Sequence, residues 1–383
     1  MLYFTIIIYL ILSALIYDFI EVKNGKNFNF YLIYVLFICL SGFRYYVGGD
    51  TFNYIYQHNF IPTLSELPHA NIGVTKFRPL WLLLSSSAKS ITDSFILVQF
   101  FHAIIVNSII FKFIKDNTRN IFTAILLYFI GYYFYFNFEI LRESLAISMF
   151  IVSLKYYNKN KWVYYYIYSF VAFLFHFSAI ILFVMPLLKK VEIKYSYILI
   201  FFVAGAFLNK MLLNYLDSLS GNTIVSYYIE TYKTYNYTFY GLISIAVFYI
   251  VYPKLLIIVN KNFLQIDYKF LKLFNIYMIL GAASALFFIF FRFLNYFTPV
   301  LFLLLADMLH ALYERKISIK RMRMVIVVFL LIAFIHCNKY FADTSEYSAG
   351  SRWYSHWYPY YSVFNKKIDP IREKISYGER SND

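Results

Sequence analysis

Long hydrophobic runs alternate with short polar connections along the chain. Runs such as 2–20, 239–259 and 293–309 carry very few charged side chains. Because about 20 apolar residues in a helix cross the hydrocarbon core of a bilayer, each run predicts a transmembrane helix. The pattern therefore predicts an all-α polytopic membrane protein.

The composition agrees with this interpretation. Hydrophobic residues make up 61% of the 383 residues and charged residues only 14%, whereas a soluble domain carries about 25% charged residues. These values exclude a soluble enzyme, a secreted disulfide scaffold and a disordered chain. Cys39 and Cys337 both lie in hydrophobic runs, so we expect neither a disulfide framework nor a zinc cluster from them.

Lysine and arginine residues gather in the short connections between the runs. The formal net charge is +15, but charge in short loops indicates topology and contact with membrane lipids, not nucleic acid. Placing these clusters in the cytoplasm puts the N-terminus outside. The spans then fall at 2–20, 29–43, 95–112, 120–137, 141–156, 195–213, 239–256, 270–290, 293–311 and 324–340.

Two further apolar segments do not fit single crossings. Segment 79–90 is short, and we predict a re-entrant or interfacial helix on the outer face. Segment 162–188 has basic residues at both ends, which predicts a hairpin of two short helices turning near His176. With this hairpin we expect about twelve crossings, within a range of about ten to thirteen, and a C-terminus outside.

The long polar segments of the chain then lie on the outer side of the membrane. We predict a single multi-span membrane domain over 1–340, with outer loops at 44–78 and 214–238, and an extracytoplasmic tail over 341–383. Long connections are usually functional, whereas the cytoplasmic loops are short and carry no glycine-rich phosphate motif. The sequence therefore favours an outer working surface.

The first outer loop opens with a candidate site. Two glycines followed by Asp50 predict a tight turn that presents a carboxylate at the membrane surface. Arg44, just before them, offers a planar fork of donors suited to phosphate oxygens. The alternative is that Arg44 only reaches toward the lipid headgroups and that the glycine pair is only a turn.

A second candidate lies at the outer start of the predicted span 141–156. Glu139, Arg142 and Glu143 are spaced i, i+3 and i+4, which predicts one shared helical face. A helix N-terminus beside an arginine can bind phosphate. The alternative is an internal Glu139–Arg142 ion pair that fixes packing.

Two single residues complete the candidates. Arg292 lies alone between two spans at their outer turn. It is either a substrate contact or an anchor to the lipid headgroups. His176 is the one histidine in its apolar hairpin. It is either a general base or a structural hydrogen-bonding group. His336 and His356 are further options for a base.

An ordered set of short motifs resembles the EpsG-type, Wzy-like bacterial polysaccharide polymerases. The first is Phe-Arg-Tyr-Tyr-Val-Gly-Gly-Asp-Thr-x-x-Tyr at 43–54. The others are Leu-Arg-Glu-Ser-Leu-Ala at 141–146, Tyr156-Tyr157, Phe-His-Phe-Ser-Ala at 175–179, Arg292-Phe293 and Trp-Tyr-Pro-Tyr at 357–360. Glu143 departs from the family pattern, in which we expect Gln, so the resemblance implies no catalytic carboxylate there.

The resemblance implies a GT-C-like glycosyltransferase of the bacterial inner membrane. It would join oligosaccharide repeat units carried on undecaprenyl diphosphate, at the periplasmic or extracytoplasmic face, to build O-antigen, capsule or exopolysaccharide. It implies no nucleotide sugar, no cofactor and no metal. The implied partners are the lipid-linked oligosaccharide, membrane lipids and a chain-length regulator protein, with no nucleic acid.

We assign hypothetical roles on this basis. Arg142 and Arg292 would bind the diphosphate, with Arg44 in support. Either Asp50 or His176 would deprotonate the acceptor hydroxyl, and the sequence leaves both open. Further substrate contacts are predicted at Tyr54, Arg78, Glu139 and Glu143.

Two other functions compete with this interpretation. A lipid-linked oligosaccharide flippase or other transporter would place charged residues along a path through the membrane, but here the unusual charges gather at one face. A membrane acyltransferase would need an acyl donor that reaches a histidine within the membrane.

Overall fold

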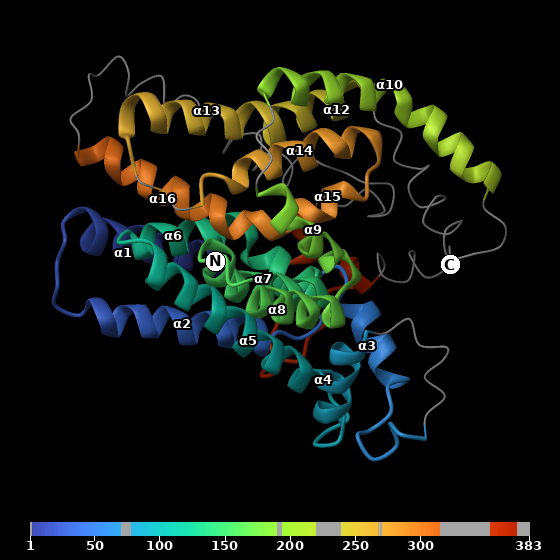
Figure 1. Cartoon of the computed structure of the whole chain (residues 1–383). Helices are drawn as coiled ribbons and strands as arrows, with labels where there is room; N and C mark the ends of the chain where they lie inside the picture. The colour runs from blue at the N-terminus through green and yellow to red at the C-terminus, as the bar shows by residue number, and fades with distance from the viewer. Residues whose placement is uncertain are drawn as a thin grey trace.

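The structure is a computed structural model. It describes residues 2–69, 78–189, 194–219, 239–266, 268, 270–314 and 353–373. Within these ranges the chain is all helical, and the only β pairing is an isolated bridge between Arg44 and Ser362. The predicted all-α fold is confirmed, and Figure 1 shows its layers of helices.

The first half of the chain forms a bundle of helices. They are α1 (Leu2–Ala14) continued by η1 (Leu15–Phe19), α2 (Lys26–Gly42), α5 (Phe95–Asn117), α6 (Ile121–Tyr128) continued by η3 (Phe129–Tyr133) and η4 (Tyr135–Glu139), and α7 (Leu141–Asn158). Phe37 of α2 is fully buried, with its ring centroid 4.6 Å from that of Tyr133. Gly42 brings α2 close to α5, because a Cβ there would lie 2.7 Å from Phe100 Cδ2. Close side-chain packing of this kind holds helices together within a bilayer.

The second half of the chain packs above this bundle in the view of Figure 1. Its helices are α10 (Tyr195–Leu219), α12 (Phe239–Ala246) continued by η6 (Val247–Val251), α13 (Tyr252–Val259) and η7 (Asn260–Leu264), α14 (Leu273–Leu286), α15 (Phe290–Leu294), η8 (Asn295–Phe297) and α16 (Thr298–Glu314). Gly205 of α10 lies against α14, where a Cβ would be 3.1 Å from the Leu286 nitrogen. α16 lies between the two layers.

Four helical segments in the described part of the chain are long and apolar enough to cross a membrane. They are Leu2–Phe19, Phe95–Asn117, Gly241–Asn262 and Phe290–Glu314, and several shorter apolar helices accompany them. This architecture is that of a polytopic membrane protein. The predicted span 324–340 lies outside the described residues.

The segment 162–188 forms the predicted hairpin. α8 (Trp162–Phe175) runs to the turn at His176, and after the 3₁₀ turn η5 (Phe177–Ile180) the helix α9 (Ile181–Leu188) returns. Lys189 Nζ then donates to the Tyr157 carbonyl at 2.6 Å and to Asn160 Oδ1 at 2.8 Å. The two basic ends therefore meet on one side of the molecule, as their charge predicts.

The predicted outer loop 44–78 contains more regular structure than its length alone indicates. It forms α3 (Thr51–Asn59), and the predicted short helix follows as α4 (Pro79–Lys89), with a proline in its first turn. Trp81 of α4 is buried beside Tyr54 of α3, at 5.5 Å between ring centroids. In Figure 1, α3 and α4 lie at the right, and the connection from α1 to α2 lies at the left.

The described part of the tail packs onto the end of α2. The Tyr45 N–H donates to the Tyr361 carbonyl and the Val363 N–H donates to the Phe43 carbonyl, both at 2.9 Å. The Tyr360 hydroxyl donates to the Leu40 carbonyl at 3.1 Å. The described part of the tail and the start of the loop 44–78 therefore lie on one side of the bundle. The predicted loop 214–238 lies mostly outside the described residues.

Candidate functional site

The glycine turn is held by the carboxylate of Glu139. Its Oε1 accepts the Gly49 N–H at 2.8 Å and the Trp357 indole N–H at 2.5 Å, and its Oε2 accepts the Asp50 N–H at 2.9 Å. Hydrogen bonds to an ionised acceptor are about twice as strong as neutral ones. Glu139 therefore fixes the turn and joins it to the tail.

This arrangement corrects the prediction for Glu139. The helix that contains it ends there, and Ile140 departs from helical geometry with φ −92° and ψ 53° before α7 begins. Glu139 thus shares no helical face with Arg142 and Glu143. Its described partners belong to the turn and the tail, so the structure has no internal Glu139–Arg142 ion pair.

Both glycines are required by the geometry of the turn. Gly48 has φ +121°, and a Cβ there would lie 2.7 Å from the Phe138 carbonyl oxygen. A Cβ on Gly49 would lie 2.9 Å from Glu139 Oε2 and equally close to His356 Nδ1. The positive φ and the backbone contact favour glycine at 48, and at 49 any larger residue would displace the carboxylate of Glu139 or the ring of His356. The turn leaves the Asp50 side chain exposed, as predicted.

Arg44 is a structural residue of this loop. It is fully buried, with its guanidinium 4.8 Å from the centre of the Phe138 ring. It donates to the Ser41 carbonyl at 2.6 Å and to the Val47 carbonyl at 3.0 Å. Burial lowers the pKa of Arg44 to about 10, against an opposing effect of the Glu139 charge. Two of its donors therefore hold the backbone that leads into the turn, while Nη2 is buried without a hydrogen-bond partner among the described residues, and a contact of Arg44 with phosphate stays a prediction.

Three arginines from different parts of the chain lie close enough to His176 to act on it electrostatically. Arg78 precedes α4, Arg142 lies in the first turn of α7, and Arg292 lies in α15, yet all three act electrostatically on His176. We call these three residues the arginine cluster. Arg292 is exposed and the other two are half-buried.

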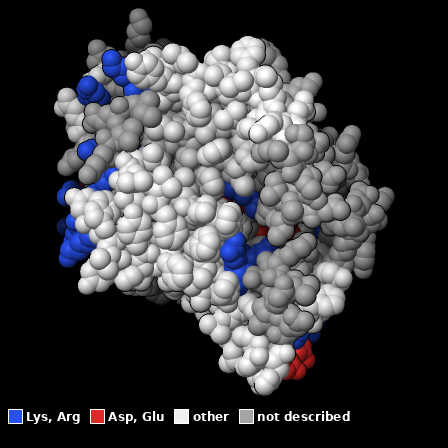
Figure 2. Space-filling view, turned by 45° about the vertical axis from the view of Figure 1, so that its right-hand side comes forward, with Lys and Arg blue, Asp and Glu red and all other residues white. Residues whose placement is uncertain are grey.

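Figure 2 shows that basic side chains gather in two places on the face in view, along the left edge and in a hollow near the centre. Acidic atoms lie beside the basic group in the hollow, while most of the described surface around it is uncharged. Basic groups in a hollow with mostly uncharged walls favour the approach of anionic ligands.

Aromatic rings support two members of the arginine cluster. The Arg78 guanidinium lies 5.0 Å from the centre of the Phe173 ring and 4.9 Å from that of Phe177. The Arg142 guanidinium lies 5.6 Å from the ring of Tyr54. Cation–π contacts of this kind contribute about 0.5–2 kcal/mol and orient the guanidinium plane.

Arg142 retains an unused donor. Its Nε is buried without a hydrogen-bond partner among the described residues. Burial raises the pKa of Tyr54, and this effect exceeds the opposing charge and hydrogen bond of Arg142. The phenol is therefore neutral, and the contact of Arg142 with Tyr54 is one between a cation and an uncharged ring.

Glu143 lies beside the arginine cluster, almost completely buried. Its Oε1 accepts the Asn295 side-chain amide at 3.0 Å. Arg292 acts electrostatically on Glu143, and both of them, with Asp50, act on Tyr135. Glu143, Arg292 and Asp50 therefore share one neighbourhood. Asn295, three residues after Arg292 in the same turn, is a contributor that the sequence analysis missed.

The hydrogen bonds of His176 indicate which of its two ring nitrogens carries the proton. Its Nδ1 accepts the Ser178 backbone N–H at 3.3 Å and lies 2.6 Å from Ser178 Oγ. A neutral imidazole that accepts at Nδ1 carries its proton on Nε2. Ser178 Oγ also forms a hydrogen bond with the Tyr296 hydroxyl, at 2.9 Å. Tyr296 is a second residue near the site that the sequence alone did not indicate.

The fold and this site define a class: an all-helical, polytopic membrane protein with basic groups gathered from several helix ends on one face. A family model described as the EpsG family matches residues 27–362. The chain belongs to the EpsG family, so the resemblance seen in its motifs is confirmed. No curated protein and no solved structure matches it. It is an integral membrane protein of polysaccharide biosynthesis.

Proposed function

We propose that the chain is a glycosyltransferase that polymerises oligosaccharide repeat units linked to undecaprenyl diphosphate. It acts at the extracytoplasmic face of the bacterial plasma membrane and builds O-antigen, capsule or exopolysaccharide. The observation that carries the proposal is the arginine cluster around His176, in one neighbourhood with the exposed carboxylate of Asp50.

The reaction needs what this arrangement offers. An acceptor hydroxyl oxygen of one repeat unit bonds to the anomeric carbon of the donor chain. The bond from that carbon to the diphosphate oxygen breaks, and undecaprenyl diphosphate leaves with the electron pair. Charge that develops on the leaving group is stabilised by fixed cationic donors, and Arg142 and Arg292 supply them.

The unused Nε donor of Arg142 supports this role. A buried donor without a partner costs about 1–3 kcal/mol. A phosphate oxygen of the substrate would satisfy it, and guanidinium is suited to two-point contacts with phosphate. Arg78 would add a third positive charge near the same group.

Asp50 is our choice for the general base. It is exposed, and its backbone is fixed by Glu139, so the carboxylate is presented in a defined position. His176 is less suited to take a proton, because its Nε2 already carries one and the three guanidinium groups oppose a second. We assign His176 as a hydrogen-bond donor to substrate oxygens.

The remaining acidic and aromatic residues act as positioning groups in this proposal. Glu139 holds the turn, Tyr54 supports Arg142, and Glu143 with Asn295 lies against Arg292. We further propose that 1–340 form one membrane domain and that the tail is extracytoplasmic, because its described part packs on the first outer loop.

Purified protein with lipid-linked repeat units tests the proposal. Lengthening of the glycan on its lipid is the expected result, in detergent and without any nucleotide sugar. Transfer of the lipid between leaflets of proteoliposomes without lengthening would identify a flippase and refute the proposal. A change of Arg119, exposed and remote from the arginine cluster in sequence, to Lys is a suitable matched control.

A further inference from the structure

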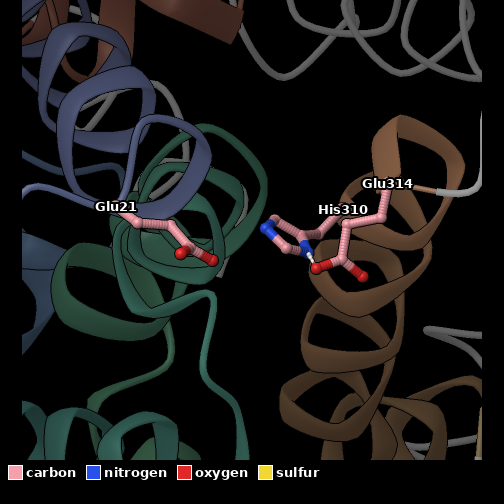
Figure 3. Close-up of side chains that lie close together, drawn as sticks. All are labelled: Glu21, His310 and Glu314. Carbon is pink, nitrogen blue, oxygen red and sulfur yellow. Dashed lines mark ion pairs between the residues drawn. The ribbon is translucent and has the colours of Figure 1, made fainter.

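A second group of chemically active side chains lies away from the arginine cluster. Glu21, just after η1, faces His310 and Glu314 near the end of α16 (Figure 3). We call these three residues the Glu–His–Glu cluster. One ligand atom from each residue lies within 4.8 Å of the others. In Figure 1 the end of α16 and the connection after η1 lie at the left, opposite α3 and α4.

The orientation of His310 follows from one hydrogen bond. Its Nε2 lies 2.9 Å from the Asp18 carbonyl oxygen, which can only accept a hydrogen bond. Nε2 must therefore carry the proton, and in the neutral ring Nδ1 presents a lone pair. A histidine held in this way by a backbone carbonyl is the usual arrangement for a metal ligand.

The lone pair of His310 points at another acceptor. Nδ1 lies 3.6 Å from Glu314 Oε1, and the Glu21 carboxylate is the third member of the group. An unprotonated nitrogen and two carboxylates repel one another unless a cation lies among them. A metal ion bound by all three groups would compensate this repulsion.

The neighbouring residues hold the cluster in place. Asp18 is buried, and its Oδ2 accepts the Thr123 N–H at 2.7 Å and the Thr123 hydroxyl at 3.0 Å. The Phe19 ring lies 5.6 Å from the His310 ring, between centroids. The segment that presents Glu21 and the ring of His310 are therefore fixed relative to each other.

We propose that the Glu–His–Glu cluster binds a divalent transition-metal ion, with Zn²⁺ as the best match. Imidazole nitrogen favours Zn²⁺ and its neighbours over Mg²⁺ or Ca²⁺, and carboxylate oxygens are accepted ligands of Zn²⁺ at about 2.0–2.2 Å. Ligand atoms around such an ion stand roughly 3.3 Å apart. Small rotations of the two glutamates reach this spacing, and water completes the coordination.

The ion would join the end of the first span to α16. α15, η8 and α16 follow one another directly. The proposed metal site therefore lies at the opposite end of the helical segment that begins near Arg292. This inference does not depend on the proposed polymerase activity. It predicts a structural metal site remote from the arginine cluster.

The test uses the full-length protein in detergent, purified through a tag without histidines and stripped with a chelator. Zn²⁺ titration by calorimetry, and Co²⁺ titration followed by its visible absorption, should reveal a site in the unchanged protein. Glu21→Gln and Glu314→Gln should each weaken Zn²⁺ binding at least about tenfold, since even partners outside the ligand set cost about 10–100-fold. At the same concentration, Zn²⁺ should raise the Tm of the unchanged protein more than that of either variant.

Asp116→Asn is the matched control. Asp116 is an exposed acid in a charge pair with Lys112 at 2.9 Å and belongs to no such cluster. Its variant should bind Zn²⁺ like the unchanged protein. Equal affinity and an equal Tm rise in the two glutamate variants would overturn the proposal, and so would the absence of binding to the unchanged protein. The cluster would then be a group of polar side chains that holds no ion.

Discussion

Replacing Arg142 with lysine should stop polymerisation while leaving the protein folded. Lysine keeps the positive charge and can keep a cation–π contact with Tyr54, where the guanidinium now lies 5.6 Å from the ring centre. It loses the Nε donor, which has no partner among the described residues, and the planar fork. The variant therefore isolates the contact with substrate from the contacts that fold the site.

The magnitude follows from the single contact removed. Loss of one well-placed donor to a developing negative charge lowers the rate by about 10²–10³-fold, or about 2.7–4 kcal/mol. The folded protein loses little, because Nε makes no hydrogen bond to the described part of the chain and a lysine ammonium can still donate to the Tyr54 hydroxyl in place of the Arg142 side chain. We expect an unchanged Tm together with a polymerisation rate reduced by about two to three orders of magnitude.

The assay compares Arg142→Lys with Arg119→Lys. Arg119 is exposed in the connection between α5 and α6, so its variant carries the same chemical change elsewhere. Membrane abundance, Tm and the number of repeat units per lipid are measured for both. Polymer of normal length and rate from Arg142→Lys would refute the diphosphate contact. A large fall in abundance would instead make Arg142 a packing residue.

Three other outcomes are expected. Asp50→Asn keeps the N–H that binds Glu139 but removes the base, so polymerisation should fall by about 10²–10⁴-fold at normal abundance; polymer of normal length would reduce the residue to part of a turn. A cysteine at Ser65 should react with a membrane-impermeant reagent from outside, and one at Lys159 only after permeabilisation; the reverse pattern would invert the predicted orientation. Burial lowers the pKa of His58 to about 4, below its ordinary value. Because the unfolded chain then binds this proton first, Tm should fall as the pH drops from about 6.5 toward 4, and less so in His58→Gln; an equal fall in both proteins would contradict this.

Charge and hydrophobic pattern were enough to predict the hairpin and the helical class. The basic ends of the segment 162–188 must share one side, and the bonds of Lys189 to Tyr157 and Asn160 place them there. This succeeded because the cost of burying charge in a bilayer acts on the sequence directly. Helix α3 was not expected, since a short polar helix depends on packing partners such as Trp81.

Side-chain roles were harder to predict than the spans. Arg44 could serve phosphate or backbone carbonyls equally well by its chemistry, and only the folded loop brings Ser41 and Val47 to its donors. The shared face of Glu139 and Arg142 assumed one continuous helix, which the backbone at Ile140 interrupts. Our proposal of Asp50 rather than His176 as the base uses the hydrogen bond from the Ser178 N–H to His176 Nδ1, whose direction the sequence does not encode.

The central claim is that this protein lengthens lipid-linked glycan. The most direct measurement counts repeat units per lipid, by mass spectrometry, after purified protein is mixed with single lipid-linked units. The account predicts a series of two, three and more units, with release of undecaprenyl diphosphate at each step. Single units that remain single in the presence of folded protein, while the same protein moves them between leaflets, would contradict it.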